Sequence, residues 1–351
     1  MSVSQRIRVL VIDDSAFTRR TLIRMLDASP LIEVVAWARD GEEALRIALE
    51  NEIDLITLDL QMPRMDGFTF LRLIMARKPT PVMVISGRSG DQEVFRALDL
   101  GAVDFLAKPS LRATTELQNI EQELIRKVHA IRQLRIDKVQ ERLDAPPPLT
   151  SPAGPVSPAG AHRVVAIGSS TGGPAALMQI FGAFAEPPPC AFIVSQHMPK
   201  GFTRSFAARL DRLTALRALE AESGCALGEG TILIAPGGSH LEFESQGGLP
   251  RARVVPSEPG DKYAPAVDRM FQSAAKHYGA DLLAVVLTGM GDDGRLGAQA
   301  VKQTGGRVIA ESEETAVIFG MPQQVIRSGA ADAVLPLAEI PAAIHSGMEE
   351  N

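Results

Sequence analysis

The stretch from Arg163 to Ile180, RVVAIGSSTGGPAALMQI, decides the fold that we expect for the C-terminal part of the chain. Val164 to Ile167 is a short apolar run with β-branched residues, which predicts a buried parallel strand. Gly168 to Gly173 predicts a tight turn. Pro174 suits the first turn of the helix that we expect to continue from Ala175 to Ile180. A strand, a glycine-rich turn and a helix in succession are typical of an α/β fold.

The glycine-rich turn also suggests chemistry. Gly168, Ser170 and Gly172 fit the pattern G-x-S-x-G, a strand-to-helix turn that exposes a serine oxygen above a sheet. The N–H groups at the start of the following helix would stabilise negative charge beside this turn. A bound phosphate would be stabilised in the same way, so the turn alone leaves both a nucleophile and a phosphate loop open.

Composition places limits on function. The 351 residues suffice for two or three domains, and 45% hydrophobic with 22% charged residues is an ordinary globular mix. A net charge of −6 argues against nucleic-acid binding and against a polybasic membrane surface. The two cysteines, Cys190 and Cys225, show no metal-ligand spacing, and no apolar run is long enough to span a membrane. We therefore expect a soluble cytoplasmic protein without direct membrane insertion.

The N-terminal part alternates strand and helix patterns. Five strands alternating with helices predict a (βα)5, flavodoxin-like parallel sheet, whose site lies beyond the carboxyl ends of its strands. The expected strands are Arg8 to Ile12, Glu33 to Ala38, Asp54 to Leu58, Val82 to Ile85 and Asp104 to Ala107. The expected helices between and after them are Phe17 to Ala28, Gly41 to Glu50, Phe68 to Ala76 and Asp91 to Leu100.

Polar residues follow four of these strands. Asp13 and Asp14 follow the first strand and Asp59 follows the third, and the right-handed crossover rule makes those strands neighbours. Three crowded carboxylates repel each other, and a hard cation such as Mg²⁺ would relieve that repulsion. Ser86 and Lys108 add a hydroxyl and a positive charge at the same edge.

The segments VIDDSAFTRR, LDLQMPRMDG, ISG and AKP resemble the two-component receiver domain over about residues 6 to 128. The resemblance implies that Asp59 is the phosphoacceptor, that Ser86 is the switch hydroxyl, and that Lys108 contacts the acyl phosphate and precedes a cis bond to Pro109. It implies a Mg²⁺ site formed by Asp13, Asp14, Asp59 and the backbone carbonyl of Gln61. Metal and lysine would neutralise the phosphoryl oxygens during transfer.

Domain boundaries follow from composition. Glu116 to Leu143 is long, charged and periodic, and we expect it to be one helix that ends the receiver domain at residues 1–143. Asp144 to His162 holds six prolines and predicts a semi-stiff linker. A second, catalytic domain is then expected over residues 163–351.

The second domain is predicted to be a doubly wound, mostly parallel α/β domain. Its expected strands are Val164 to Ile167, Ala191 to Ser195, Thr231 to Ala235, Ala252 to Val255, Leu283 to Thr288 and Arg307 to Ala310, with helices at Phe202 to Leu213, Pro265 to Tyr278 and Gly294 to Thr304. If three of the strands are parallel neighbours, the turns GSSTGG, QHMPKGF and TGMGDDG bring together Ser170, His197 and Asp293. These residue types are a nucleophile, a general base and its orienting acid. Oxyanion donors would be the backbone N–H groups of Thr171 and Met290.

Other residues of the same types could fill each of these three roles, so residue chemistry alone leaves the assignment of nucleophile, base and acid open. Ser169 competes with Ser170, His240 competes with His197, and Asp292 competes with Asp293. The acidic turn TGMGDDG also suits a metal or a phosphate. The order Ser, His, Asp differs from the α/β-hydrolase order, so G-x-S-x-G does not assign that family.

The segments IGSSTGGPAAL, QHMPKGFTRSFAARL, APGGSHLEF, PAVDRMF, LTGMGDDG and FGMP resemble the catalytic domain of the chemotaxis protein-glutamate methylesterases. The resemblance implies Ser170 as nucleophile, His197 as base and Asp293 as orienting acid, with Thr171 and Met290 as the oxyanion hole and no cofactor for the esterase reaction. It implies methylated chemoreceptor helices as substrate, deamidation of receptor glutamines as a second reaction, a CheA-type histidine kinase as phosphodonor, and recruitment to membrane receptor arrays.

Three hypotheses about output follow. In the first, the receiver covers the Ser170 edge and phosphorylation of Asp59 shifts the population towards an open, active esterase. The alternatives are a phosphorylation-gated adaptor without catalysis and an esterase relative that serves a receptor pathway other than chemotaxis. A DNA-binding output is disfavoured by the acidic charge and by the absence of a helix-turn-helix pattern.

Overall fold

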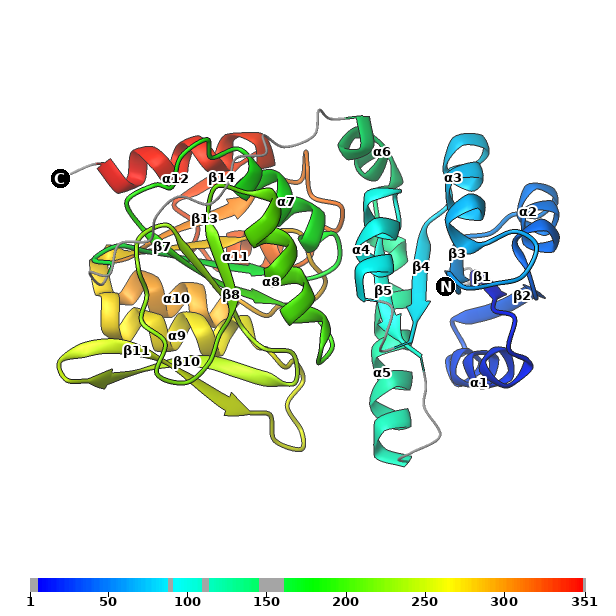
Figure 1. Cartoon of the computed structure of the whole chain (residues 1–351), viewed down its shortest axis with the longest axis horizontal. Coiled ribbons are helices and arrows are strands. Elements are labelled where there is room, and N and C mark those ends of the chain that lie inside the picture. Colours follow the sequence, from blue (N-terminus) through cyan, green and yellow to red (C-terminus); the bar gives the residue numbers. More distant parts are fainter. Residues whose placement is uncertain (1–5, 88–90, 109–113, 145–160, 350–351) are drawn as a thin grey trace. The chain divides into compact units, whose positions relative to one another are not determined.

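A computed structural model describes residues 6–87, 91–108, 114–144 and 161–349, whose elements are drawn in Figure 1. The chain divides into two compact units, one ending at Asp144 and one beginning at Ala145, and each has its own hydrophobic core. Pro109 and most of the expected linker lie outside the described residues. Within the described ranges, no helix is both long and apolar enough to cross a membrane.

The first unit is a five-stranded parallel sheet with the strand order β2-β1-β3-β4-β5. Its strands are β1 (Ile7–Ile12), β2 (Ile32–Ala38), β3 (Leu55–Leu58), β4 (Val82–Ser86) and β5 (Asp104–Ala107). Its helices are α1 (Ala16–Asp27), α2 (Gly41–Glu50), α3 (Gly67–Arg77), α4 (Asp91–Asp99) and α5 (Thr114–Ala130), followed by α6 (Ile136–Asp144). Strand residues such as Val9 and Leu55 pack against Leu22 of α1 and Leu124 of α5. The predicted (βα)5 sheet is confirmed.

Side-chain caps start three helices directly after strands or short loops. Ser15 Oγ accepts a hydrogen bond from Thr18 N before α1, and Asp40 Oδ1 accepts two backbone N–H groups before α2. Asp66 Oδ1 accepts from Thr69 N at 2.7 Å before α3. Such caps satisfy N–H groups that have no partner within the helix. The caps therefore fix where α1, α2 and α3 begin, close to the carboxyl edge of the sheet.

The expected single helix from Glu116 to Leu143 is wrong. Helix α5 ends in a 3-10 turn (Ile131–Gln133), Leu134 has extended backbone, and α6 begins at Ile136. The break allows α6 to bury Val139 and to place Leu143 against Gly101. Burying the apolar face of α6 stabilises the folded unit more than one uninterrupted helix would. No proline or glycine in this stretch signals the break in the sequence.

The main sheet of the second unit has seven parallel strands in the order β14-β13-β12-β6-β7-β9-β8. The strands are β6 (Val164–Ser169), β7 (Ala191–Gln196), β8 (Arg217–Glu220), β9 (Thr231–Ile234), β12 (Leu282–Val286), β13 (Arg307–Glu311) and β14 (Ala333–Leu335). The helices are α7 (Gly173–Gly182), α8 (Phe202–Leu213), α9 (Val267–Tyr278), α10 (Arg295–Gln303), α11 (Met321–Arg327) and α12 (Ile340–Glu349). Helices α9 and α10 pack together on one face of the sheet, and α7, α8 and α12 cover the other (Figure 1). The predicted doubly wound, mostly parallel sheet is confirmed.

The expected strand at Ala252 to Val255 does not join this sheet. It lies in β11 (Leu249–Pro256), which pairs antiparallel with β10 (Ser239–Gln246) as a hairpin beside α9 (Figure 1). Gly247 and Gly248 form the connection with φ of 62° and 82°. A two-residue turn with positive φ at both positions matches the twist of a hairpin, so the Gly-Gly pair was a signal for this element.

Candidate active site

Ser170 follows the central strand β6, between the neighbouring strands β12 and β7. Its N–H donates to Thr288 O at 3.0 Å, and its carbonyl accepts from Gly173 N at 2.8 Å, which closes a tight turn. Gly172 has φ of 78°, a conformation that glycine adopts without strain. The turn leaves the Ser170 side chain only partly buried, at the start of α7.

His197 and Asp293 come from the two neighbouring strands. His197 follows β7, where its N–H donates to Ser169 O at 3.0 Å, and His197 Nε2 lies 2.7 Å from Asp293 Oδ2. Burial alone would raise the pKa of Asp293. The hydrogen bond and the electrostatic interaction with His197, together with the N–H groups of Asp268 and Val267, outweigh burial and hold that pKa below its ordinary value. Asp293 is therefore an ionised, fixed acceptor.

The orientation of the imidazole assigns its two nitrogens. Because Nε2 faces Asp293, Nδ1 is the ring nitrogen that remains for a second partner. The hydrogen bonds of the described residues do not include one between Ser170 Oγ and His197. Hydrogen bonds between catalytic groups are often long before substrate binds. What the structure shows is that Ser170 and His197 follow the neighbouring parallel strands β6 and β7 at the same edge of the sheet.

The acidic turn after β12 packs directly on Ser170. A Cβ atom on Gly289 would lie 2.8 Å from Ser170 Cβ, so only glycine allows this approach. The N–H groups of Gly320 and Met321 both donate to Gly289 O, at 3.1 and 2.8 Å. The FGMP segment thus holds the turn that carries Met290.

The first unit gathers its predicted residues at one edge of its sheet. Carboxylate oxygens of Asp13, Asp14 and Asp59 all lie within 4.8 Å of one another. Lys108 Nζ lies 2.5 Å from Asp59 Oδ2 and 3.2 Å from Asp13 Oδ2. Gln61 N donates to Asp59 Oδ1 at 3.3 Å. The Ser86 hydroxyl lies at this edge but donates to Gly87 O.

This cluster fits a divalent cation. Asp13 is fully buried, and within the described residues its Oδ2 has the Lys108 ammonium at 3.2 Å but no well-aligned hydrogen bond. Burial, followed by the charge of Asp59, raises the pKa of Asp13 to about 6. Burial likewise raises the pKa of Asp59 although Lys108 lies beside it. A doubly charged ion with oxygen ligands would relieve both carboxylates.

Comparison with known proteins assigns the family. The sequence model described as "CheB methylesterase" matches residues 165–344, and that of the response regulator receiver domain matches residues 9–120. The chain belongs to the CheB methylesterase family. It is 48% identical to protein-glutamate methylesterase/protein-glutamine glutaminase 3 of Geobacter sulfurreducens, over 95% of each chain.

Other members of the CheB methylesterase family are similarly close in sequence. A protein of Myxococcus xanthus named protein-glutamate methylesterase/protein-glutamine glutaminase 1 is 47% identical over 97% of this chain and 96% of its own. The crystal structure of the Thermotoga maritima CheB methylesterase catalytic domain is 45% identical, has a TM-score of 0.51, and covers 52% of this chain and 97% of that one. The predicted family and enzyme class are confirmed, and the adaptor alternative is not favoured.

The three rival residues have other roles in the CheB fold. Ser169 is fully buried and its hydroxyl donates to Gln196 Oε1 at 2.6 Å. His240 is also fully buried, with Nε2 2.8 Å from Asp261 Oδ2 and Nδ1 accepting from a backbone N–H. Asp292 is exposed and pairs with Lys262 at 2.9 Å. Ser169 and His240 are thus buried beneath the exposed edge, and the Asp292 carboxylate is occupied by its ion pair with Lys262.

Sequence reasoning missed three residues that build this site. The Gln196 amide donates to Ser170 O at 2.9 Å and to His197 O at 3.1 Å. Tyr263 stacks on the His197 ring. Glu311, fully buried at the end of β13, accepts from Thr288 N at 2.7 Å. A glutamine or glutamate that closes an apolar strand run was a usable signal, whereas nothing in the sequence places Tyr263 near His197.

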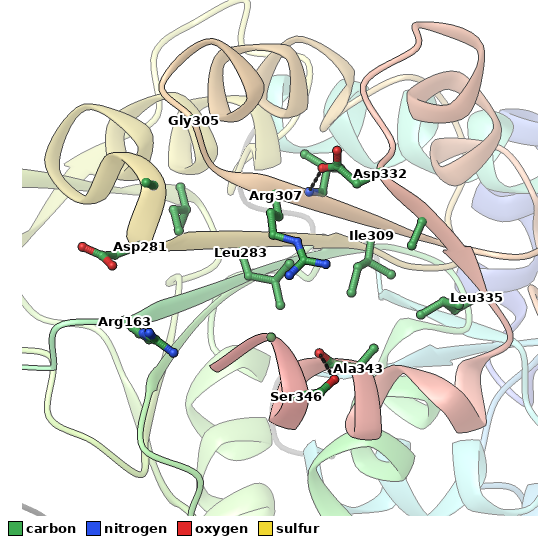
Figure 2. A pocket seen from close by; sticks show the side chains of 15 residues that line it. Arg163, Asp281, Leu283, Gly305, Arg307, Ile309, Asp332, Leu335, Ala343 and Ser346 are labelled. Atoms are coloured by element: carbon green, nitrogen blue, oxygen red, sulfur yellow. Dashed lines mark hydrogen bonds between the residues drawn. The ribbon is translucent and has the colours of Figure 1, made fainter. Parts of the chain in front are cut away.

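A cavity of about 270 Å³ lies at the opposite edge of the same sheet (Figure 2). Its lining includes residues that precede or begin strands, such as Arg163, Leu283 and Arg307, together with Ser346 of α12. Asp332 in its wall accepts a hydrogen bond from Val308 N at 2.7 Å. The amino-terminal edge of the strands is not where parallel sheets bind substrates, so we assign the chemistry to the carboxyl edge.

Proposed function

We propose that this chain is a phosphorylation-activated protein-glutamate methylesterase that hydrolyses glutamyl methyl esters on chemoreceptors and deamidates receptor glutamines in chemotaxis. The observation that carries the proposal is the 2.7 Å pairing of His197 with the ionised Asp293, held beside Ser170 at the sheet edge. The domain boundaries that we propose are a receiver at residues 1–143, a linker at 144–162 and a catalytic domain at 163–351.

In the proposed reaction, Ser170 Oγ attacks the ester carbonyl carbon while His197 Nδ1 takes the serine proton. Asp293 accepts from Nε2–H and stabilises the imidazolium. The N–H groups of Thr171 and Met290 stabilise the oxyanion. The C–O bond to the methoxy group then breaks, and His197 returns the proton so that methanol leaves. Water hydrolyses the acyl-enzyme and restores the glutamate. Neither step requires a cofactor.

In the proposed receiver, Asp59 accepts the phosphoryl group from a CheA-type histidine kinase. Mg²⁺ would be held by Asp13, Asp14, Asp59 and the carbonyl of Gln61, and it would neutralise the charge on the transferred group. Lys108, 2.5 Å from Asp59, supports a role at the phosphoryl oxygens, and Ser86 is the proposed switch hydroxyl. The protein would act in the cytoplasm, recruited to receptor arrays in the membrane.

Methanol release from methylated receptor membranes tests the esterase. Ser170→Ala should abolish release. Ser346→Ala is the matched control, because the exposed Ser346 hydroxyl donates only to carbonyls of its own helix α12, away from the carboxyl edge of the sheet. Release that persists in Ser170→Ala would refute the assignment of the nucleophile. No release from the wild type, with receptors known to be methylated, would leave the activity unsupported.

Regulation is tested on the same substrate. A small phosphodonor with Mg²⁺ should raise methanol release by the wild type but not by Asp59→Asn. If the receiver occludes the catalytic edge, deletion of residues 1–143 should raise basal release. Unchanged or lower release after the deletion would count against occlusion.

A further inference from the structure

The ring of Tyr263 lies flat against the imidazole of His197. The ring centroids are 4.4 Å apart and the ring planes differ by 10°. The one described hydrogen bond of the His197 side chain joins Nε2 to Asp293, which fixes a single point of the ring. A ring held at one point can still tilt about that bond. The aromatic face of Tyr263 supplies the second constraint, because stacked rings resist tilting.

We propose that Tyr263 is a positioning residue for ester hydrolysis, which holds the imidazole plane so that Nδ1 stays directed at Ser170. This inference rests on the proposed function. Proton transfer to a general base depends on alignment as well as on distance. A tilt of the imidazole would therefore lower the rate of attack while leaving substrate binding largely unchanged.

Tyr263 is itself held against the turn that carries the rest of the site. A Cβ atom on Gly291 would lie 2.4 Å from the Tyr263 hydroxyl, so the tyrosine packs directly on the backbone of the TGMGDDG turn. The preceding residue, Lys262, pairs with Asp292 of the same turn at 2.9 Å. The stacking ring is therefore braced against the acidic turn.

The segment on either side of Tyr263 is anchored by the buried His240. Its Nε2 lies 2.8 Å from Asp261 Oδ2, and its Nδ1 accepts from Ala266 N at 3.3 Å. Asp261 Oδ2 also accepts from Glu258 N at 2.7 Å. One imidazole thus ties both ends of the loop from Asp261 to Ala266. The second histidine–aspartate pair of the domain therefore builds the platform that supports Tyr263.

Imidazole NMR of the full-length protein tests the stack without any turnover. The ring current of Tyr263 shifts the carbon-bound protons of His197 upfield. These resonances should move downfield in Tyr263→Leu, which keeps apolar bulk but lacks the ring, and in Tyr263→Ala. They should keep their positions in Tyr263→Phe. Unchanged His197 resonances in both Leu and Ala variants would overturn the stack.

Steady-state methanol release from methylated receptors tests the consequence. Tyr263→Leu and Tyr263→Ala should lower kcat by about three- to tenfold with KM within about twofold of the wild type, and Tyr263→Phe should restore most of kcat. Leu249→Ala, at the exposed hairpin tip, is the matched control. A raised KM with unchanged kcat would show that Tyr263 only binds substrate, and wild-type kcat in both variants would also overturn positioning. Absence of methanol release by the wild type itself would instead refute the proposed function. The NMR measurement would then still show whether Tyr263 stacks on His197.

Discussion

Asp13→Asn should stabilise the N-terminal unit at neutral pH in the absence of divalent cations. Asp13 is fully buried, and burial with the charge of Asp59 raises its pKa from 3.8 to about 6. At 1.36 kcal/mol for each pH unit, ionised Asp13 costs the folded state about 3 kcal/mol. Asparagine keeps the oxygen that accepts from Ser15 N and removes the charge. The expected gain is therefore up to about 3 kcal/mol at pH 7.

The pH dependence has a definite sign. The folded-state pKa of Asp13 lies above its unfolded value, so the favourable contribution of the protonated form is complete below about pH 3.8 and is lost as pH rises through about 6. The advantage of Asp13→Asn should accordingly shrink as pH falls towards 4. Mg²⁺ should stabilise the wild type more than the variant, because the variant has lost one carboxylate ligand.

Urea unfolding of the full chain followed by tryptophan fluorescence measures this effect. Trp37 in β2 is the only tryptophan of the sequence, so the signal reports on the N-terminal unit. Asp14→Asn is the matched control, because Asp14 is exposed and its replacement should change the unfolding free energy by about 0.5 kcal/mol or less. An Asp13→Asn protein less stable than the wild type at pH 7 without Mg²⁺ would refute the reasoning. A gain that does not shrink at low pH would refute it as well.

Three further substitutions probe the catalytic unit. Asp293→Asn should lower kcat on the order of 10³- to 10⁴-fold with little change in fold, measured by methanol release, because an amide N–H facing Nε2 of His197 favours the wrong tautomer. Gly289→Ala should lower kcat by roughly 10²-fold, since its Cβ would meet Ser170 Cβ at 2.8 Å; wild-type turnover would show that the turn yields without cost. Ser195→Ala should raise the free energy of unfolding, measured by thermal unfolding, by about 1 kcal/mol. The reason is that the fully buried Ser195 hydroxyl has no hydrogen-bond partner among the described residues. A loss of stability would instead point to a bound water at this hydroxyl.

Much of the fold, and the gathering of the candidate site residues at two sheet edges, could be predicted from sequence because the signals are local. Apolar runs mark buried strands, and glycine-rich turns and caps mark where they end. In a parallel sheet, residues that follow neighbouring strands meet at one edge, so Asp13 with Asp59, and Ser170 with His197, were placed without coordinates. The hairpin was missed although Gly247 and Gly248 signalled it locally.

Only the tertiary structure decided features that depend on contacts between distant segments. The break at Leu134 exists because α6 packs back on its own unit, which no local propensity encodes. The difference between His197 and His240 is one of burial, and burial depends on which elements cover a residue.

The same holds for the finer geometry of the catalytic edge. The stacking of Tyr263 on His197 joins two loops that are far apart in the sequence, and the pairing of Nε2 with Asp293 adds a third, the turn after β12. The sequence by itself determined which strands form and which residues follow them, because periodicity and turn chemistry act over a few residues. The tertiary structure decided which of those residues are exposed, paired and aligned, because packing acts across the whole domain.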